Sequence, residues 1–111
     1  MTKHKTIKMR PYFFESDKEI DAGIAELMAA IWQHKFLTWS CCEENEPGMM
    51  IITFIFGLYA DEFIKFCQDL IDARWKIKGG LIHLWGETVP LISVIFPREQ
   101  YPAILDKVRN S

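Results

Sequence analysis

Apolar residues recur at helical spacing in one stripe that runs from Ile20 to Trp32. Successive members of the stripe are four, three, one, three and one residues apart, so they fall on one face of a helix. Residues 16–19 (Ser-Asp-Lys-Glu) fit a capping box with Ser16 at the N-cap. The pattern predicts a helix over 17–34, which must bury its apolar face against a second layer of structure.

Two strand-like segments follow this helix and flank a short polar loop. Successive side chains of residues 36–42 point to opposite faces of a strand, whereas residues 49–56 form a β-branched and aromatic run without alternation. Such a run is typical of a strand covered on both faces. Pro47 and Gly48 suit the centre of a type II turn. We therefore expect residues 36–42 and 49–56 to form an antiparallel hairpin through the loop 43–48.

The rest of the chain continues the alternation of strands and helices, with Gly79 and Gly80 expected to interrupt it before the strand 81–85. The predicted elements are an edge strand over 6–14, a second helix over 61–74 capped by Asp61, strands over 81–85 and 89–96 joined by residues 86–88, and a short helix over 101–108. The order (β)αββαββα predicts an α+β fold. It is a two-layer sandwich with a mainly antiparallel sheet and helices on one face, a ferredoxin-like variant.

Length and charge limit the class of protein. The 111 residues are enough for a single domain, 1–111, with residues 1–5 expected to fray. The net charge of −2 provides no overall basic field, so we expect no nucleic-acid partner. The apolar run 49–60 is shorter than the roughly 20 residues of a bilayer span, so we expect no membrane partner either. Three cysteines and no apolar leader after Met1 predict a cytoplasmic location with free thiols.

Aromatic residues are unusually frequent for a small domain. Eight Phe, four Trp and three Tyr make up 14% of the chain, and rings of this size are rarely all buried. They either enlarge the core or line a pocket or a subunit interface. The excess predicts a homodimer, because a twofold interface uses the same apolar patch twice. The uncharged strand 81–85 is the candidate interface, with Trp85 at its centre and Leu81 and His83 beside it.

The cysteines are the first candidates for chemistry. Cys41 and Cys42 are adjacent on a strand, so their thiols point to opposite faces and do not converge on a metal. Cys67 lies on the apolar face of the second predicted helix and is expected to be buried and unreactive. The catalytic candidates are therefore Cys42 and Cys41, together with His83 only if the strands 36–42 and 81–85 are neighbours. Ordinary strand positions are the alternative for both thiols.

Other polar clusters give weaker signals. Glu43, Glu44 and Glu46 could hold a hard cation but lack the spacing of a calcium loop, and a solvated loop is the simpler interpretation. The segment 74–78 interleaves cations with apolar residues, which also fits a solvated strand face. His34 and His83 are each expected to be structural. The sequence contains no phosphate-binding glycine loop, and we expect neither a cofactor nor a metal.

Several short stretches can be compared with a known pattern. They are residues 31–32 (Ile-Trp), residues 38–42 (Thr-Trp-Ser-Cys-Cys), Asn45 and Gly48, the strand 51–54, and residues 92–98, which end in Phe-Pro-Arg. Together they resemble small uncharacterised bacterial proteins with a helix, LW-x-x-G, T-x-x-S-C-x-x-N, apolar strand pattern and a later V-x-F-P-R strand end. The resemblance implies the same fold and no particular reaction. Lys35 stands where that pattern has Gly, and Cys41 where it has Ser.

These observations favour a small cytoplasmic α+β protein that acts by binding or self-association, with no assignable reaction. The alternative is a small enzyme or a thiol-dependent ligand binder that uses the region of Cys41 and Cys42. The catalytic alternative requires one of these thiols in a cleft beside a base. The binding interpretation requires an exposed aromatic patch instead.

Overall fold

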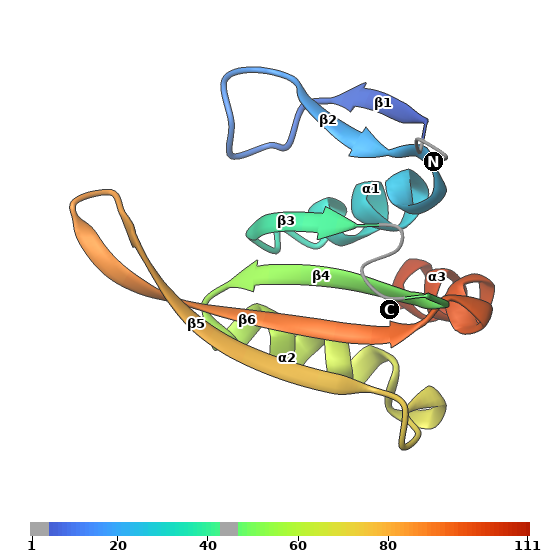
Figure 1. Cartoon of the computed structure of the whole chain (residues 1–111). Helices are drawn as coiled ribbons and strands as arrows, with labels where there is room; N and C mark the ends of the chain where they lie inside the picture. Colours follow the sequence, from blue (N-terminus) through green and yellow to red (C-terminus); the bar gives the residue numbers. More distant parts are fainter. Residues whose placement is uncertain (1–4, 43–46) are drawn as a thin grey trace.

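Three β-hairpins, each followed by a helix, make up the fold (Figure 1). The computed structural model describes residues 5–42 and 47–111, apart from the side chain of Cys42. The elements are β1 (Thr6–Met9), β2 (Lys18–Asp21) and α1 (Ala25–Gln33), then β3 (Thr38–Cys42), β4 (Met49–Ile55) and α2 (Gly57–Phe66), then β5 (Lys76–Leu84), β6 (Glu87–Pro97) and α3 (Tyr101–Arg109). Short 3-10 turns over Ala22–Ile24, Gln68–Leu70 and Arg98–Gln100 complete these connections.

Four antiparallel strands form the main sheet in the order β3-β4-β6-β5, and β1 pairs with β2 in a separate two-stranded sheet. Because β3 pairs with β4, the predicted hairpin of 36–42 with 49–56 is confirmed. Strand β6 lies between β4 and β5, so these two strands run parallel and α2 connects them, as in a split βαβ unit. The predicted α+β sandwich is confirmed, and its narrower assignment as a ferredoxin-like variant stays a prediction.

The core forms where α2 packs on the central strands. The fully buried Phe63 of α2 lies between Phe54 of β4 and Phe96 of β6, with ring centroids 5.4 and 6.1 Å away. Figure 1 shows α2 crossing the face of the sheet that is turned away from the viewer, and α3 contacts both α1 and α2. Phe54 and Phe96 therefore hold the helical layer against the sheet.

Strand β4 is buried on both faces, as its unalternating sequence predicts. Ile52 and Phe54 point toward the helices, whereas Thr53 and Ile55 have the opposite parity and are also buried. On that second face, the hydroxyl groups of Thr53 and Ser93 lie 2.7 Å apart in a hydrogen bond between β4 and β6. This bond satisfies two polar groups that burial would otherwise leave without partners.

The predicted start of the first helix at residue 17 is wrong. Residues 18–21 form β2, because Ile20 pairs with Ile7 of β1 and buries its side chain beneath the hairpin. The α-helix begins only at Ala25, and no side chain caps it, so Ser16 is not an N-cap. The predicted edge strand over 6–14 is also wrong, since β1 pairs with β2 and not with the main sheet.

The end of α1 shows how the chain accommodates a lysine where the resembling pattern has glycine. Lys35 adopts a left-handed backbone with φ of 64°, a conformation that residues other than glycine rarely adopt. The Tyr12 hydroxyl donates a hydrogen bond to the Lys35 carbonyl, and the Lys35 ammonium lies 4.9 Å from the Tyr12 ring centroid. Tyr12 therefore supports the backbone that stops the helix.

Two further boundaries differ from the predictions. Helix α2 begins at Gly57, before Asp61, and ends at Phe66, well short of residue 74. Strand β5 begins at Lys76 and runs through Gly79 and Gly80, which pair with Ile92 and Leu91 of β6 instead of interrupting the chain. The two glycines fit because β5 is an edge strand, where pairing with one neighbour keeps the backbone extended. The predicted C-terminal helix is confirmed as α3.

We predict that Phe63→Ala lowers the free energy of unfolding by about 3–5 kcal/mol, because it removes a fully buried ring and leaves a cavity between two others. Leu58→Ala is the matched control on the same helix, since Leu58 is 64% exposed. Its cost should stay within about 0.5 kcal/mol. Urea denaturation of both variants measures the difference, and equal costs would contradict this account of the core.

Candidate functional site

The hairpin β5–β6 ends in a strained tight turn. Leu84 pairs with Glu87, which leaves only Trp85 and Gly86 in the loop, with φ of 55° and 76°. Positive φ at both central residues defines a type I′ turn, where Asn-Gly is the favoured pair. A left-handed tryptophan costs on the order of 1 kcal/mol, and Trp85 is nevertheless 63% exposed.

The interface candidates from the sequence all lie on this hairpin. Leu81 is 75% exposed, and His83 is exposed on the same strand. Strand β5 is an edge of the main sheet, and Figure 1 shows the hairpin extending past the other elements. His83 is thus exposed to solvent at the edge of the sheet, and its expected structural role stays a prediction. We call the outer half of the hairpin, residues 81–87, the hairpin tip.

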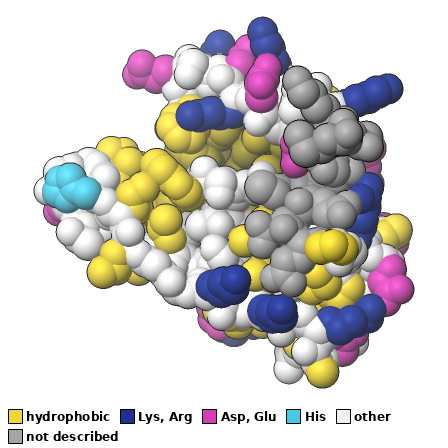
Figure 2. All heavy atoms as spheres, in the orientation of Figure 1, with side chains coloured by type: hydrophobic (Ala, Val, Ile, Leu, Met, Phe, Trp, Pro, Cys, Tyr) yellow, Lys and Arg dark blue, Asp and Glu magenta, His cyan; other side chains and the backbone are white. Residues whose placement is uncertain are grey.

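An apolar hollow separates the hairpin tip from the loop between β1 and β2. The hollow has a volume of about 380 Å³. Its apolar lining residues are Phe13, Phe14, Trp39, Ile55, Leu84 and Trp85. Figure 2 shows hydrophobic side chains gathered on both sides of a recess at this end of the molecule. Two of the four tryptophans, Trp39 and Trp85, are thus exposed and border the same hollow.

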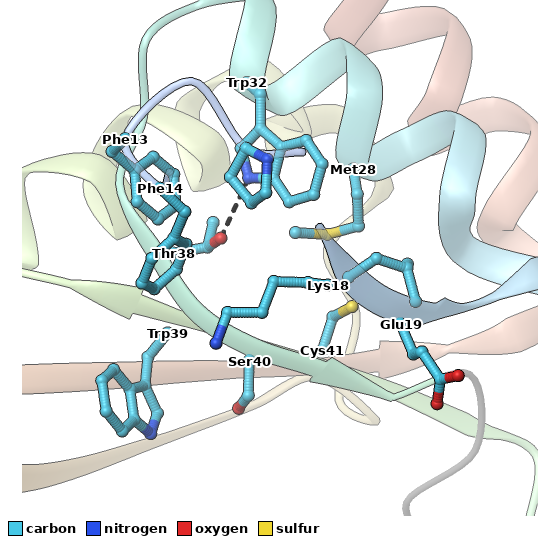
Figure 3. Close-up of a pocket in the computed structure, with 12 residues that line it drawn as sticks. Phe13, Phe14, Lys18, Glu19, Met28, Trp32, Thr38, Trp39, Ser40 and Cys41 are labelled. Carbon is cyan, nitrogen blue, oxygen red and sulfur yellow. Dashed lines mark hydrogen bonds between the residues drawn. The ribbon is translucent and has the colours of Figure 1, made fainter. Parts of the chain in front are cut away.

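A second, smaller cavity lies between β2, α1 and β3 (Figure 3). We call it the ring cavity; its volume is about 160 Å³. Met28 and Trp32 of α1 are buried in its wall, and the Trp32 indole N–H donates a hydrogen bond of 3.0 Å to the Thr38 hydroxyl. Phe13, Phe14 and Trp39 line both this cavity and the hollow, so the two spaces adjoin.

The three cysteines have different surroundings. Cys41 of β3 is half-buried and lines the ring cavity, and Cys42 ends the strand, with its side chain outside the described residues. Cys67 is fully buried, as predicted, and burial raises the pKa of its thiol from 9.0 to about 12, while the charge of Lys107 acts in the opposite direction. The buried thiol stays protonated at neutral pH and is a poor nucleophile.

The structure separates the cysteines of β3 from His83. Strands β3 and β5 are the two opposite edges of the sheet, with β4 and β6 between them. Three strand spacings of about 4.8 Å put their backbones roughly 14 Å apart. A site of Cys41 or Cys42 with His83 was expected only if their strands were neighbours. Strands β3 and β5 are not neighbours, so this site does not form.

The remaining polar candidates have structural partners or lie outside the described residues. His34 Nε2 lies 2.8 Å from the Val108 carbonyl, and its ring stacks on Phe36, so the expected structural role is confirmed. Within residues 5–42 and 47–111, no three His, Cys, Asp or Glu side chains cluster as metal ligands do. Glu43, Glu44 and Glu46 lie outside those ranges.

The basic segment 74–78 is partly neutralised by its neighbours. The Arg74 guanidinium pairs with Asp72 at 2.7 Å and also with Glu99. Its hydrogen bonds hold the pKa of the Asp72 carboxyl below the usual range. The Trp75 indole N–H donates to the Gln100 side chain at 2.7 Å. These contacts tie the residues just before β5 to the turn before α3. They agree with the interpretation of this segment as a solvated strand face.

Sequence reasoning missed the aromatic residues that border the two spaces. Phe13, Phe14 and Trp39 were not among its candidates, yet they separate the ring cavity from the hollow. The signal was present as three consecutive rings at residues 12–14 beside Pro11. Three adjacent rings cannot all enter one core, so at least one of them had to face a pocket or solvent.

Comparisons with protein-family models, with curated proteins and with solved structures find no match to this chain. The resemblance to small bacterial proteins therefore stays a prediction. None of the helices among the described residues is long and apolar enough to cross a membrane.

We predict that a neutral iodoacetamide reagent labels Cys41 in the native protein much faster than Cys67. The first side chain lines a cavity that reaches the surface, whereas the second is fully buried and protonated. Mass spectrometry of proteolytic fragments resolves the two sites, and labelling in denaturant should remove the difference. Equal native rates would contradict the burial of Cys67.

We also predict that stability falls as the pH rises from about 9 to about 12. The folded-state pKa of Cys67 is raised above its ordinary value of 9.0. Over this window the unfolded chain has released the proton while the folded chain still holds it, so the free energy of unfolding falls. Below pH 9 the contribution is complete. Urea denaturation should show a shallower alkaline decline for Cys67→Ala than for the wild type, whereas parallel curves would rule out this thiol as a cause.

Proposed function

We propose that this chain is a self-associating binding module, a cytoplasmic homodimer with no reaction of its own that joins through the edge strand β5. The observation that carries the proposal is the hairpin tip, where a tryptophan is held exposed on a strained backbone. Strained residues cluster at functional sites, and this tendency motivates the choice of the hairpin tip. A second copy of the chain is the occupant that we propose for this edge.

The geometry of β5 suits antiparallel pairing with its twin. As an edge strand, β5 has one row of backbone N–H and C=O groups that no strand of the sheet pairs. Lys76 and Lys78 lie at its start and its end is uncharged, so antiparallel pairing places each lysine beside the uncharged end of the partner. Parallel pairing would align like charges. The twofold arrangement thus avoids repulsion between the two strands.

Exposed apolar side chains supply part of the association energy. Ile77, Leu81 and Trp85 are 61%, 75% and 63% exposed. Full burial of a large apolar side chain contributes about 1.5–3 kcal/mol, and association costs on the order of 4–15 kcal/mol. Six such side chains from two protomers offset a cost of this size when main-chain hydrogen bonds form as well. The two ranges overlap, so the side chains alone do not fix the affinity, and the proposal places the dimer in the micromolar range.

The alternative, a thiol-dependent enzyme, lacks the pairing of Cys41 or Cys42 with His83 that the sequence suggested. Cys41 lines the ring cavity together with Lys18 and Glu19, but no histidine lines it among the described residues, and His83 lies on the opposite edge of the sheet. The half-buried Cys41 remains compatible with a thiol-dependent binder. The exposed tryptophan of the hairpin tip favours a self-associating module over a thiol-dependent enzyme or a thiol-dependent binder.

We predict that Leu81→Lys and Trp85→Asn both shift the dimer to monomers by at least about tenfold in Kd, equivalent to about 1.4 kcal/mol. Each removes apolar area from the interface. Trp85→Asn should at the same time leave the monomer as stable or more stable, because asparagine favours the left-handed backbone of this turn. Sedimentation equilibrium gives the Kd, and urea denaturation of dilute protein gives the stability.

Leu58→Lys is the matched control, since Leu58 is similarly exposed at 64% but lies on α2, outside the hairpin. It should leave the dimer intact. A wild-type species of 13.0 kDa across the micromolar range would overturn the proposal. If both hairpin variants remain dimeric, the protein is a dimer but does not associate through this interface.

A further inference from the structure

We propose that the ring cavity binds a small aromatic carboxylate, a single six-membered ring that carries an anionic group. The inference concerns the edge of the sheet formed by β3, and it does not depend on dimerisation through β5. The cavity lies between two sheets that do not pair with each other, since β2 belongs to the N-terminal hairpin and β3 to the main sheet.

The size of the cavity selects a single ring. Its volume of about 160 Å³ is close to the roughly 150 Å³ of an apolar cavity that takes up benzene. A fused two-ring system or a peptide side chain with its backbone is larger than this space and would have to extend into the adjoining hollow. One ring with a short substituent fits when the substituent points toward solvent.

The walls are suited to the face and edge of an aromatic ring. Met28 and Trp32 are buried, and Phe13 and Phe14 line the same space from the loop after β1. Thioether and aromatic groups both make favourable contacts with rings. The hydrogen-bonding capacity of the Trp32 indole is already used by Thr38 at 3.0 Å, so this part of the wall presents an apolar surface to a ligand.

The mouth of the cavity presents a positive charge. In Figure 3, the Lys18 side chain extends across the cavity and its ammonium lies on the side of Ser40 and Trp39. This ammonium lies 4.3 Å from the Phe14 ring centroid. Glu19 also lines the cavity, and Figure 3 places its carboxylate on the other side, away from the ammonium. No carboxylate among the described residues forms an ion pair with Lys18, so its charge can attract an anion.

The two features together define the ligand class. A ring in the apolar interior removes hydrocarbon surface from water, and its carboxylate can then accept a charge-assisted hydrogen bond from Lys18 at the rim. A neutral ring of the same size gains only the first contribution. A ring with an ammonium group places a like charge beside Lys18 and binds more weakly than either.

Three matched probes test this order: benzoate, benzyl alcohol and benzylamine. Each is titrated into uniformly ¹⁵N-labelled protein while the Trp32 indole N–H resonance is followed, because this group lies in the cavity wall. We expect benzoate to bind at least about fivefold more tightly than benzyl alcohol, and benzylamine to bind most weakly. No shift of the indole resonance with any probe would overturn the site, and equal affinities for the three would overturn the anionic preference.

Two variants separate the ring and charge contributions. Lys18→Met should reduce benzoate affinity to that of benzyl alcohol without changing the latter, whereas Lys65→Met on α2 should change neither. Cys41→Leu adds bulk inside the cavity and should abolish binding of all probes; far-UV circular dichroism and thermal denaturation check that it folds. If Cys41→Leu does not fold, the Lys18→Met variant still tests the proposal. An unchanged preference of Lys18→Met for benzoate over benzyl alcohol would reject the role of Lys18.

Discussion

The antiparallel pairing of β4 with β6 is the interaction on which the rest of the structure depends. Seven consecutive residue pairs, from Met49 with Pro97 to Ile55 with Leu91, join two local hairpins into one sheet. This pairing places β3 and β5 at opposite edges. It also brings Phe54 and Phe96 to the same face, where Phe63 packs between them. One long-range pairing thus fixes the core and both candidate binding regions.

Elements governed by local patterns could be predicted, and those that depend on distant partners could not. The second half of the stripe, up to Trp32, identified α1 because helical spacing is local, whereas its first member, Ile20, lies in β2. Ser16 to Glu19 satisfied the rules of a capping box, yet residues 18–21 form β2, since Ile20 gains burial by pairing with Ile7. Gly79 and Gly80 were expected to break the chain, but an edge strand tolerates them because only one neighbour sets their conformation.

The candidate sites divide in the same way. The hairpin tip is contiguous in the chain, and an uncharged strand with a central tryptophan was enough to single out Leu81 and Trp85. The ring cavity is assembled from the loop after β1, from β2, from α1 and from β3. Met28, Trp32 and Lys18 each looked like part of one amphipathic helix. Only the packing of the N-terminal hairpin beside β3 brings Lys18 to the mouth of the cavity.

Two of the three strained non-glycine positions among the described residues have a structural explanation. Among the described residues, Lys35, Phe56 and Trp85 are the non-glycine residues with positive φ. Tyr12 supports Lys35 through its hydroxyl, and the Phe56 N–H donates to the Pro90 carbonyl at 2.9 Å where α2 begins. Both positions sit at helix boundaries that the fold requires. Trp85 lines the hollow but stays 63% exposed, so packing within one copy of the chain leaves most of this side chain in solvent. Because rule-breaking positions are expected at functional or strained sites, Trp85 is the residue on which the proposed partner surface rests.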